Sequence, residues 1–481
     1  MTRLLLFALS SMALLTASGE QFRPTFHFSP AKNWTNDPNG AVYYRGEYHL
    51  FYQYNPFGDV WGHMSWGHAV SKDLLHWNHL PIALAEENGA MIFSGSVVVD
   101  PNTSGLCIAS PDCLIAIYTS HTPALQTQHI AVSNDLGRTW KKYAANPVID
   151  LGMKDFRDPK VFRHADKWVM VVAIPLEQKV RFFASTDLKK WDVLSDFGPQ
   201  GATNGAWECP DLFPLPVSGE SGNSKWVLSV NVNPGASAGG SGNQYFIGEF
   251  DGKNFRNSNS ADVKLWADWG KDFYASTSFS DVPRKDGRRI WIAWFSNWLY
   301  AREEPTSPFR GIMTVPRTLS LRQTKDGLRL AQTPVAELSK LRRRKIEMHE
   351  VTIAQANRRL ERFASTAYEL QTNLSNASLR LRIGPEGEQT LVGFEKDKLF
   401  MDRTHSGNVG FNKEFPGIHR APCVPGNVRV LVDSSSVEIF AGNGEVVMSD
   451  RIFPSTRSTG LQFKGVPSAR ISFTLWTLAG K

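Results

Sequence analysis

A short pattern recurs four times in this 481-residue chain at nearly regular spacing. Each copy has an Asp two residues after its first position and a Trp or Phe four or five residues after that Asp; the copies begin at Ser71, Ser133, Ser185 and Glu249. The aspartates are 62, 52 and 64 residues apart. Ser and Asp side chains bond nearby backbone amides in tight turns. One such turn per unit of this length predicts a β-propeller with one sheet per repeat.

A fifth unit is needed after residue 255 to complete such a ring. The segment Asp272–Tyr274 and the apolar run Ile290–Phe295 provide strands for it. We therefore predict an all-β fold in which a five-bladed β-propeller occupies residues 20–328.

The composition changes after about residue 325, because tryptophan becomes nearly absent until Trp476. The segment 334–345 has the pattern of a short helical linker, and we place the linker at residues 329–345. Beyond it, Val428, Val430 and Val432 alternate with other residues, as in a half-buried antiparallel strand. Similar segments at 368–383 and 471–478 predict a C-terminal β-sandwich over residues 346–481.

Three acidic residues stand in distinctive motifs in the first part of the chain. Asp37 precedes Pro-Asn-Gly, Asp158 lies between Arg157 and a proline, and Glu208 precedes Cys-Pro. The Pro-Asn-Gly sequence predicts a rigid turn around Asp37. These acids precede their repeats by 36, 29 and 43 residues, and Ser96 precedes its repeat by 39. If each blade starts with its innermost strand, all four positions face the central channel.

Carboxyl groups gathered in one pocket have the chemistry of a glycosidase. One carboxylate attacks the anomeric carbon, a second carboxyl protonates the leaving oxygen, and a third group shapes the site. We expect the positive charge of Arg157 to keep Asp158 ionised. A single motif of this kind is also compatible with an ordinary turn or a salt bridge, but three together favour a catalytic site.

These motifs resemble the three signature motifs of glycoside hydrolase family 32, the β-fructofuranosidases. The resemblance is close over residues 22–320 and looser beyond. Thr35 departs from the family pattern, where Met is more frequent. Further matching segments, in the family's order, are Phe51–Pro56, Trp61–His68, Phe93–Ser96, Gln244–Gly248, Trp294–Trp298 and Arg310–Arg317.

The resemblance implies a retaining glycosidase that removes terminal β-D-fructofuranosyl units from sucrose and short β-fructans through a fructosyl-enzyme intermediate. Asp37 would be the nucleophile, Glu208 the acid and then the base, and Asp158 a stabiliser of the transition state. No cofactor is implied. The resemblance assigns the fructose pocket to Asn36, Asn39, Gln53, Trp61, Phe93, Ser94, Arg157, Tyr274 and Trp294.

Three other functions need comparison. The box Ser133–Trp140 also occurs in sialidases, but a sialidase needs an arginine cluster and a tyrosine nucleophile. A catalytically inactive sugar-binding relative would be expected to lack Asp37 or Glu208, and both are present. A fructosyltransferase of the same fold keeps the same acids, so the sequence leaves that alternative open.

The small-residue segment 233–242 follows the start of the Glu208 unit. We expect a flexible loop that borders the pocket mouth and adds little bulk there. It resembles the exo-acting fructanases of the family more than the plant invertases. A channel closed at one end would admit a terminal sugar only, so we predict exo-hydrolysis.

The N-terminus and the net charge bear on location and partners. Residues 1–19 combine a charged start, an apolar run and small residues, the pattern of a signal peptide. No later apolar run reaches the ~18 residues that span a bilayer, so we predict a secreted protein without a membrane span. The net charge is +7, from 53 basic and 46 acidic residues spread along the chain. We interpret the basic cluster 342–345 as a solvated helix end, and predict a sugar substrate and no nucleic-acid partner.

Four cysteines are too few for a disulfide framework in a chain of this length. Cys107 and Cys113 bracket a short loop, so we predict that they form a local disulfide. Cys209 and Cys423 would then be free. A catalytic thiol at Cys209 is the competing idea, although the carboxylates already complete a mechanism. No Cys or His spacing indicates a metal site.

Overall fold

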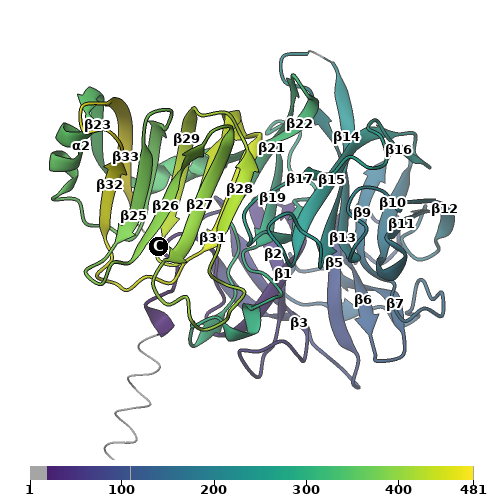
Figure 1. Ribbon diagram of the computed structural model, residues 1–481. Coiled ribbons are helices and arrows are strands. Elements are labelled where there is room, and N and C mark those ends of the chain that lie inside the picture. The colour runs from purple at the N-terminus through teal and green to yellow at the C-terminus, as the bar shows by residue number, and fades with distance from the viewer. Residues whose placement is uncertain (1–18, 109, 221, 480–481) are drawn as a thin grey trace, which may run out of the picture.

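The computed structural model describes residues 19–108, 110–220 and 222–479 (Figure 1). The predicted signal peptide, residues 1–19, lies outside the described residues except for its last position. Two bodies lie side by side in Figure 1, a ring of sheets in purple to teal and a second domain in green to yellow. No helix in the described part of the chain has the length and apolar character needed to cross a bilayer.

The first body is a five-bladed β-propeller, which confirms the predicted fold class. Its blades follow one another along the chain, and each starts with its innermost strand. The first blade contains β1 (Asn33–Tyr44), β2 (Glu47–Tyr54), β3 (Ser65–Ser71), β4 (Asn78–Leu84) and, parallel to β1, β20 (Phe309–Arg310). The second contains β5 (Met91–Asp100), β6 (Cys113–His121), β7 (Gln126–Ser133) and β8 (Lys141–Lys142).

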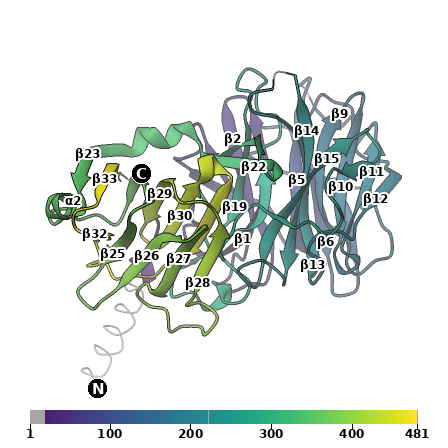
Figure 2. The same cartoon turned by 45° about the horizontal axis from the view of Figure 1, so that its top comes forward.

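The other three blades complete the ring (Figure 2). The third has β9 (Arg157–His164), β10 (Lys167–Ile174), the 3₁₀ turn η1 (Pro175–Glu177), β11 (Lys179–Ser185) and β12 (Asp192–Phe197). The fourth has β13 (Ala206–Pro216), β14 (Ser224–Asn233), β15 (Gly242–Phe250), β16 (Phe255–Asn257) and β17 (Leu265–Trp266). The fifth has β18 (Tyr274–Ser278), β19 (Arg289–Trp294), η2 (Ala301–Glu303), β21 (Arg317–Thr324) and β22 (Gly327–Pro334). Each innermost strand contacts the next, and β18 contacts β1, so the ring is closed.

The recurring sequence pattern forms the turn between the third and fourth strands of four blades. The Asp73 carboxylate accepts hydrogen bonds from the backbone N–H of Leu75 and His76, and Asp187 accepts equivalent bonds from Lys189 and Lys190. The aromatic residue of each copy packs between sheets or against the turn. The predicted role of the repeat is therefore confirmed.

All five innermost strands carry a β-bulge at the same height. In each, a segment of the inner strand is one residue longer than the segment of the neighbouring strand that it pairs with. These segments are 35–38, 92–95, 157–160, 208–211 and 274–277. The sequence around Asp37 is therefore a bulged strand, and our prediction of a turn there is wrong. Four of the innermost strands are the edges of their sheets, and β1 pairs with β20 only at Asn33 and Trp34. Pro38, Pro159 and Pro210 therefore cost no ladder hydrogen bond on the channel side.

The second domain is a sandwich of two antiparallel sheets, as predicted. The larger sheet has the order β23 (Arg342–Thr352), β33 (Arg470–Leu478), β24 (Tyr368–Asn373), β29 (Asn427–Asp433), β30 (Ser436–Ala441) and β31 (Val446–Arg451). The smaller has β28 (Ile418–Pro422), β27 (Lys398–His405), β26 (Gln389–Glu395), β25 (Ser378–Ile383) and β32 (Gly460–Lys464). The 3₁₀ turn η4 (Gly442–Gly444) joins β30 to β31, and α2 (Ile353–Leu360) starts with a capping box at Thr352.

The connection between the domains is shorter than the predicted linker. Strand β22 pairs with β21 as far as Pro334, and β23 already begins at Arg342, so only η3 (Ala336–Leu341) lies between the two sheets. Residues 342–345 are thus the start of a strand and not a helix end. The Arg342 guanidinium lies 4.0 Å above the Trp476 ring and pairs with Glu369, contacts that a sequence of consecutive basic residues does not reveal.

Charged side chains are buried where the two domains meet. Arg317 of β21 pairs with Asp268 at 3.0 Å and with Glu438 of β30 at 2.6 Å. His27 lies between Asp433 and Glu438, 2.8 and 2.9 Å from their oxygens. Each of these groups is almost fully buried, and breaking one partner of such a pair leaves an uncompensated charge. The junction therefore fixes the sandwich against the propeller.

Candidate active site

The three acids of the sequence motifs lie close together on innermost strands of the propeller. Asp37 comes from β1, Asp158 from β9 and Glu208 from β13, each within the bulge of its strand. Asp158 and the neighbouring Cys209 have left-handed backbone conformations, with φ of 68° and 45°. Non-glycine residues adopt this region at a cost, and such strain concentrates at functional sites. The bulges turn these side chains toward a common pocket.

Asp37 is buried and oriented by two hydrogen bonds. Its Oδ2 accepts from the Ser94 hydroxyl at 2.7 Å, and its Oδ1 accepts from the Asn36 amide at 2.9 Å. Burial raises the pKa of the Asp37 carboxyl, the two hydrogen bonds lower it, and the nearby charge of Glu208 raises it further; the net pKa is above its ordinary value. The carboxylate is therefore fixed in one orientation and weakly solvated, as a nucleophile requires.

Asp158 lies beside Asp37 in the same pocket. Its Oδ2 accepts the backbone N–H of Cys209 at 2.9 Å, and its own N–H donates to the Thr119 hydroxyl at 3.0 Å. Burial raises the pKa of Asp158 to about 7, although the charge of Arg157 opposes this change. Arg157 thus favours the ionised form of Asp158, as expected, but burial has the larger effect and the net pKa stays above its ordinary value.

The guanidinium of Arg157 is directed to Glu208 instead of Asp158. Its Nε and Nη2 lie 3.0 and 2.9 Å from Glu208 Oε1, and its Nη1 donates to Asp155 at 2.9 Å and to Gln126 at 3.2 Å. The Tyr274 hydroxyl donates to the other oxygen of Glu208. Burial raises the pKa of Tyr274 well above its ordinary value, so the phenol keeps its proton. Both oxygens of Glu208 thus have a fixed partner.

Cys209 lies between two of the carboxyl groups. Its sulfur is 3.5 Å from Asp37 Oδ2 and 3.6 Å from Asp158 Oδ2. Burial and the surrounding carboxylates raise the pKa of the thiol well above its ordinary value. A thiolate is the nucleophilic form of cysteine, so the structure disfavours a catalytic thiol here. Cys209 is adjacent to Glu208 in the sequence, but that position did not predict its contacts with the two aspartates.

The predicted polar pocket residues surround Asp37 and are almost fully buried. The Asn39 amide donates to the backbone oxygen of Asp37 at 3.2 Å. Gln53 of β2 donates to the backbone oxygen of Ile92 at 3.0 Å, next to Ser94. Thr35, the departure from the family pattern, is buried and donates to the backbone oxygen of Gln53 at 3.0 Å. Ser96, which we placed at the channel, instead joins β5 to β9 through Pro159 and Val161.

Aromatic rings form the remainder of the site. Trp294 packs against Trp34, Trp298 and Tyr274, and its indole N–H is buried without a hydrogen-bond partner among the described residues. A buried donor without a partner carries a desolvation cost. Trp61 and Phe93 meet edge to face at 6.1 Å, and Phe93 stacks on His121 at 4.1 Å.

Several of these contacts have no signal in the sequence motifs. His121 and Gln126 come from the β6 and β7 strands of the second blade, and Thr119 comes from β6. None stands beside an acid or in a recognisable turn, so only the neighbouring blades bring these residues to the site. The loop 233–242 connects β14 to β15, and Asn297 donates to the backbone oxygens of Gly239 and Ser241.

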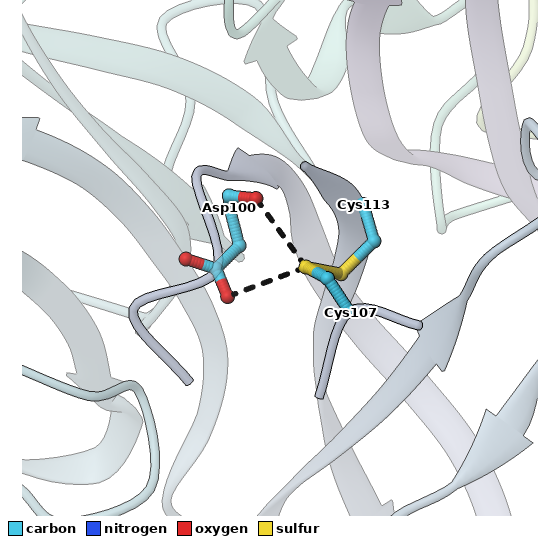
Figure 3. A group of neighbouring side chains, drawn as sticks. All are labelled: Asp100, Cys107 and Cys113. Carbon is cyan, nitrogen blue, oxygen red and sulfur yellow. Dashed lines mark hydrogen bonds between the residues drawn. A yellow bond between two sulfur atoms is a disulfide. The ribbon is translucent and has the colours of Figure 1, made fainter. Parts of the chain in front are cut away.

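One group among the described residues has the composition of a metal site, namely Asp100, Cys107 and Cys113 (Figure 3). The two cysteines are joined by a disulfide, as predicted, with a Cα–Cα distance of 5.3 Å. The Cys107 sulfur also lies 3.5 Å from the backbone oxygen of Asp100. Disulfide sulfurs have no thiolate to offer a metal ion, so the group closes the loop between β5 and β6.

Comparison with known proteins identifies the family. The model for the N-terminal domain of glycosyl hydrolases family 32 matches residues 27–334, and the model for the C-terminal domain matches residues 337–477. The chain belongs to glycoside hydrolase family 32. The levanase of Bacillus subtilis is 48% identical over 92% of this chain and 68% of its own length. The extracellular exo-inulinase of Aspergillus ficuum is 40% identical over 93% of this chain and 92% of its own length.

Solved structures agree with this family. The exo-inulinase of Aspergillus awamori superposes with a TM-score of 0.88 at 35% identity, covering 95% of this chain and 98% of that chain. A β-fructofuranosidase of Schwanniomyces occidentalis gives the same TM-score at 32% identity, covering 96% and 99%. The chain is thus an enzyme of the β-fructofuranosidase class of glycoside hydrolases. This family membership excludes the sialidase alternative.

Proposed function

We propose that this enzyme is a secreted, retaining exo-glycosidase that releases fructose from the non-reducing ends of sucrose and short β-fructans. The observation that carries the proposal is the convergence of Asp37, Asp158 and Glu208 in one pocket, each held by hydrogen bonds. Relatives support the substrate class: fructofuranosidases of Schwanniomyces occidentalis are described in complex with fructose and with fructosylnystose.

In the first step, a carboxylate oxygen of Asp37 attacks the anomeric carbon of the fructosyl unit as the bond to the leaving oxygen breaks. Glu208 gives its proton to that oxygen, and Arg157 then stabilises the carboxylate that remains. Asn36 and Ser94 aim the Asp37 oxygens, so little reorganisation is needed at the moment of attack.

In the second step, water hydrolyses the ester that the first step forms between Asp37 and the fructosyl unit. Glu208 takes a proton from the water, the water oxygen bonds the anomeric carbon, and Asp37 leaves as a carboxylate. Asp158 bonds fructose hydroxyls and stabilises the positive charge that develops on the sugar ring. Two inversions at the same carbon retain its configuration.

Exo-cleavage is supported by the loop 233–242. In the β13–β14 ladder, Asn231 lies opposite Glu208 and Asn233 opposite Ala206, so the loop begins two residues beyond the partner of the acid. Asn297 ties the same loop to the segment that carries Trp298. We infer that the loop borders the pocket mouth, which would favour entry of a chain end.

Incubation with sucrose, followed by chromatography of the products, tests the proposal. Free fructose and glucose in equal amounts support hydrolysis, longer oligosaccharides indicate a fructosyltransferase, and no reaction indicates an inactive sugar-binding relative. With long inulin or levan, we expect fructose to appear singly from the start. Early accumulation of fructo-oligosaccharides with little fructose would show internal cleavage instead.

Export is part of the proposal. The pattern of residues 1–19 supports it, and the Aspergillus relatives are named extracellular exo-inulinases. Sequencing the N-terminus of the protein recovered from culture medium would test it, with a mature start close to residue 20 as the expected result.

A further inference from the structure

A buried ion pair lies along the channel just behind the catalytic carboxyls. Lys160 of β9 and Asp211 of β13 approach to 3.3 Å between Nζ and Oδ2, and both side chains are nearly inaccessible to solvent. We call Lys160 and Asp211 the axial pair. Neither residue belongs to the fructose pocket proposed above.

The axial pair also forms hydrogen bonds with a third strand, β18. Lys160 donates to the Thr277 hydroxyl at 3.2 Å and to the backbone oxygen of Ser278. Asp211 Oδ2 accepts the backbone N–H of Ser278 at 2.6 Å. The two side chains therefore join the inner strands of three different blades at one point.

Each of these strands carries one group of the catalytic cluster a few residues earlier. Lys160 follows Asp158 by two positions, Asp211 follows Glu208 by three, and Ser278 follows Tyr274 by four. On β13 and β18 the β-bulge lies between the catalytic group and the axial contact, and on β9 Asp158 lies inside the bulge that ends at Lys160. A bulge interrupts the hydrogen-bonded ladder, so pairing with the neighbouring strand does not by itself fix the position of the catalytic group on the inner strand.

We propose that the axial pair is a positioning device that sets the spacing of Asp158, Glu208 and Tyr274. A buried ion pair contributes little net stability compared with well-packed neutral side chains, but it has a demanding geometry. Three strands that share its hydrogen bonds are therefore held in one relative register. The assignment rests on the proposed function, because it concerns the groups that perform that reaction.

The test is the double variant Lys160→Met with Asp211→Asn, which removes both charges and keeps the side-chain sizes. The amide oxygen introduced by Asp211→Asn can still accept from the Ser278 N–H, so we expect a folded protein. We expect kcat on sucrose to fall at least tenfold, KM to change less than about threefold, and the pH profile of kcat to shift, because the Tyr274–Glu208 contact loosens. The single variant Lys160→Arg keeps the charge and should keep more of kcat than the double variant does.

The matched control is Arg181→Met with Asp196→Asn, which removes an exposed ion pair of the same blade, on β11 and β12. It should leave kcat, KM and the pH profile unchanged. If the double axial variant does not fold, Asp211→Asn alone replaces it, with the same expected shift of the pH profile.

The outcomes separate the two proposals. A folded axial variant with wild-type kcat and pH profile would refute the positioning role and leave the proposed function intact. A wild-type enzyme without activity on sucrose or fructans would refute the proposed function, and this inference with it. A loss that only reflects a smaller folded fraction, with kcat per folded molecule unchanged, would also refute the positioning role.

Discussion

Replacing Asp158 with Asn should make the free enzyme more stable at neutral pH while it removes activity. Burial raises the pKa of this carboxyl from 3.8 to about 7, so the ionised form is disfavoured in the folded state. Each pKa unit corresponds to 1.36 kcal/mol, so the folded protein loses up to about 4 kcal/mol of stability when Asp158 ionises. The charges of Glu208 and Asp37 also raise this pKa, so part of the gain on substitution depends on these two neighbours.

The sign of the pH dependence follows from linkage. The folded pKa is raised, so between the two pKa values the folded state holds a proton that the unfolded state releases. The free energy of unfolding of the wild type therefore falls as pH rises through this window. Asp158→Asn is uncharged at every pH, so its advantage should be largest at about pH 8 and nearly absent at about pH 3.5.

Denaturant unfolding of both proteins at the two pH values measures this difference. Asp433→Asn is a suitable control, because Asp433 is equally buried but its pKa is lowered: burial raises it, and hydrogen bonds from His27 and two backbone N–H groups outweigh that effect. This control should lose stability at neutral pH. Two results would refute the reasoning: an Asp158→Asn variant that is less stable than wild type at about pH 8, or one whose free energy of unfolding differs from wild type by the same amount at both pH values.

Four further changes have defined outcomes. Asp37→Asn should keep the fold and lose far more than the tenfold in rate that corresponds to about 1.4 kcal/mol; a folded variant with more than about a tenth of the activity would exclude the nucleophile role. Glu208→Ala should be very poor on sucrose but much less impaired on an activated fructoside whose leaving group needs no proton, and equal losses on both would contradict its role as acid. Replacing Cys107 and Cys113 with Ser should lower the free energy of unfolding by about 2 kcal/mol, seen in denaturant titrations, with unchanged kcat. Burial lowers the pKa of His27, but hydrogen bonds to its two carboxylate partners raise it more, so the net pKa is above the ordinary value. His27→Gln should therefore lose most stability at about pH 6 and progressively less as pH rises. A loss of stability that is the same at every pH would show that protonation is not involved.

Local patterns in the sequence predicted the architecture well. The repeated turns involve hydrogen bonds between residues only two to four positions apart, such as Ser185 with Asp187, so their chemistry can be identified without knowing the fold. Their spacing then predicted the blades, and the position of Asp37, Asp158 and Glu208 ahead of their turns predicted that innermost strands carry them. The helical segment expected at residues 334–345 is a 3₁₀ turn only at Ala336–Leu341, because residues 342–345 pair with β33 instead.

The orientation of side chains within the site depended on the tertiary structure. The acids were recognisable by motif, but the bulges were not, and one extra residue in a strand reverses which face each later side chain occupies. Arg157 accordingly binds Glu208, 51 positions away, instead of its neighbour Asp158.

The sequence by itself determined the number of blades, the sandwich that follows and the acids of the site, because turns, alternation and motifs are local properties of the chain. Only the tertiary structure decided which groups meet: Cys209 between two aspartates, Arg157 on Glu208, and Lys160 with Asp211 behind them. These contacts join residues from different blades. Their distances depend on the closure of the whole ring and on the burial that follows from it, which no local segment of sequence encodes.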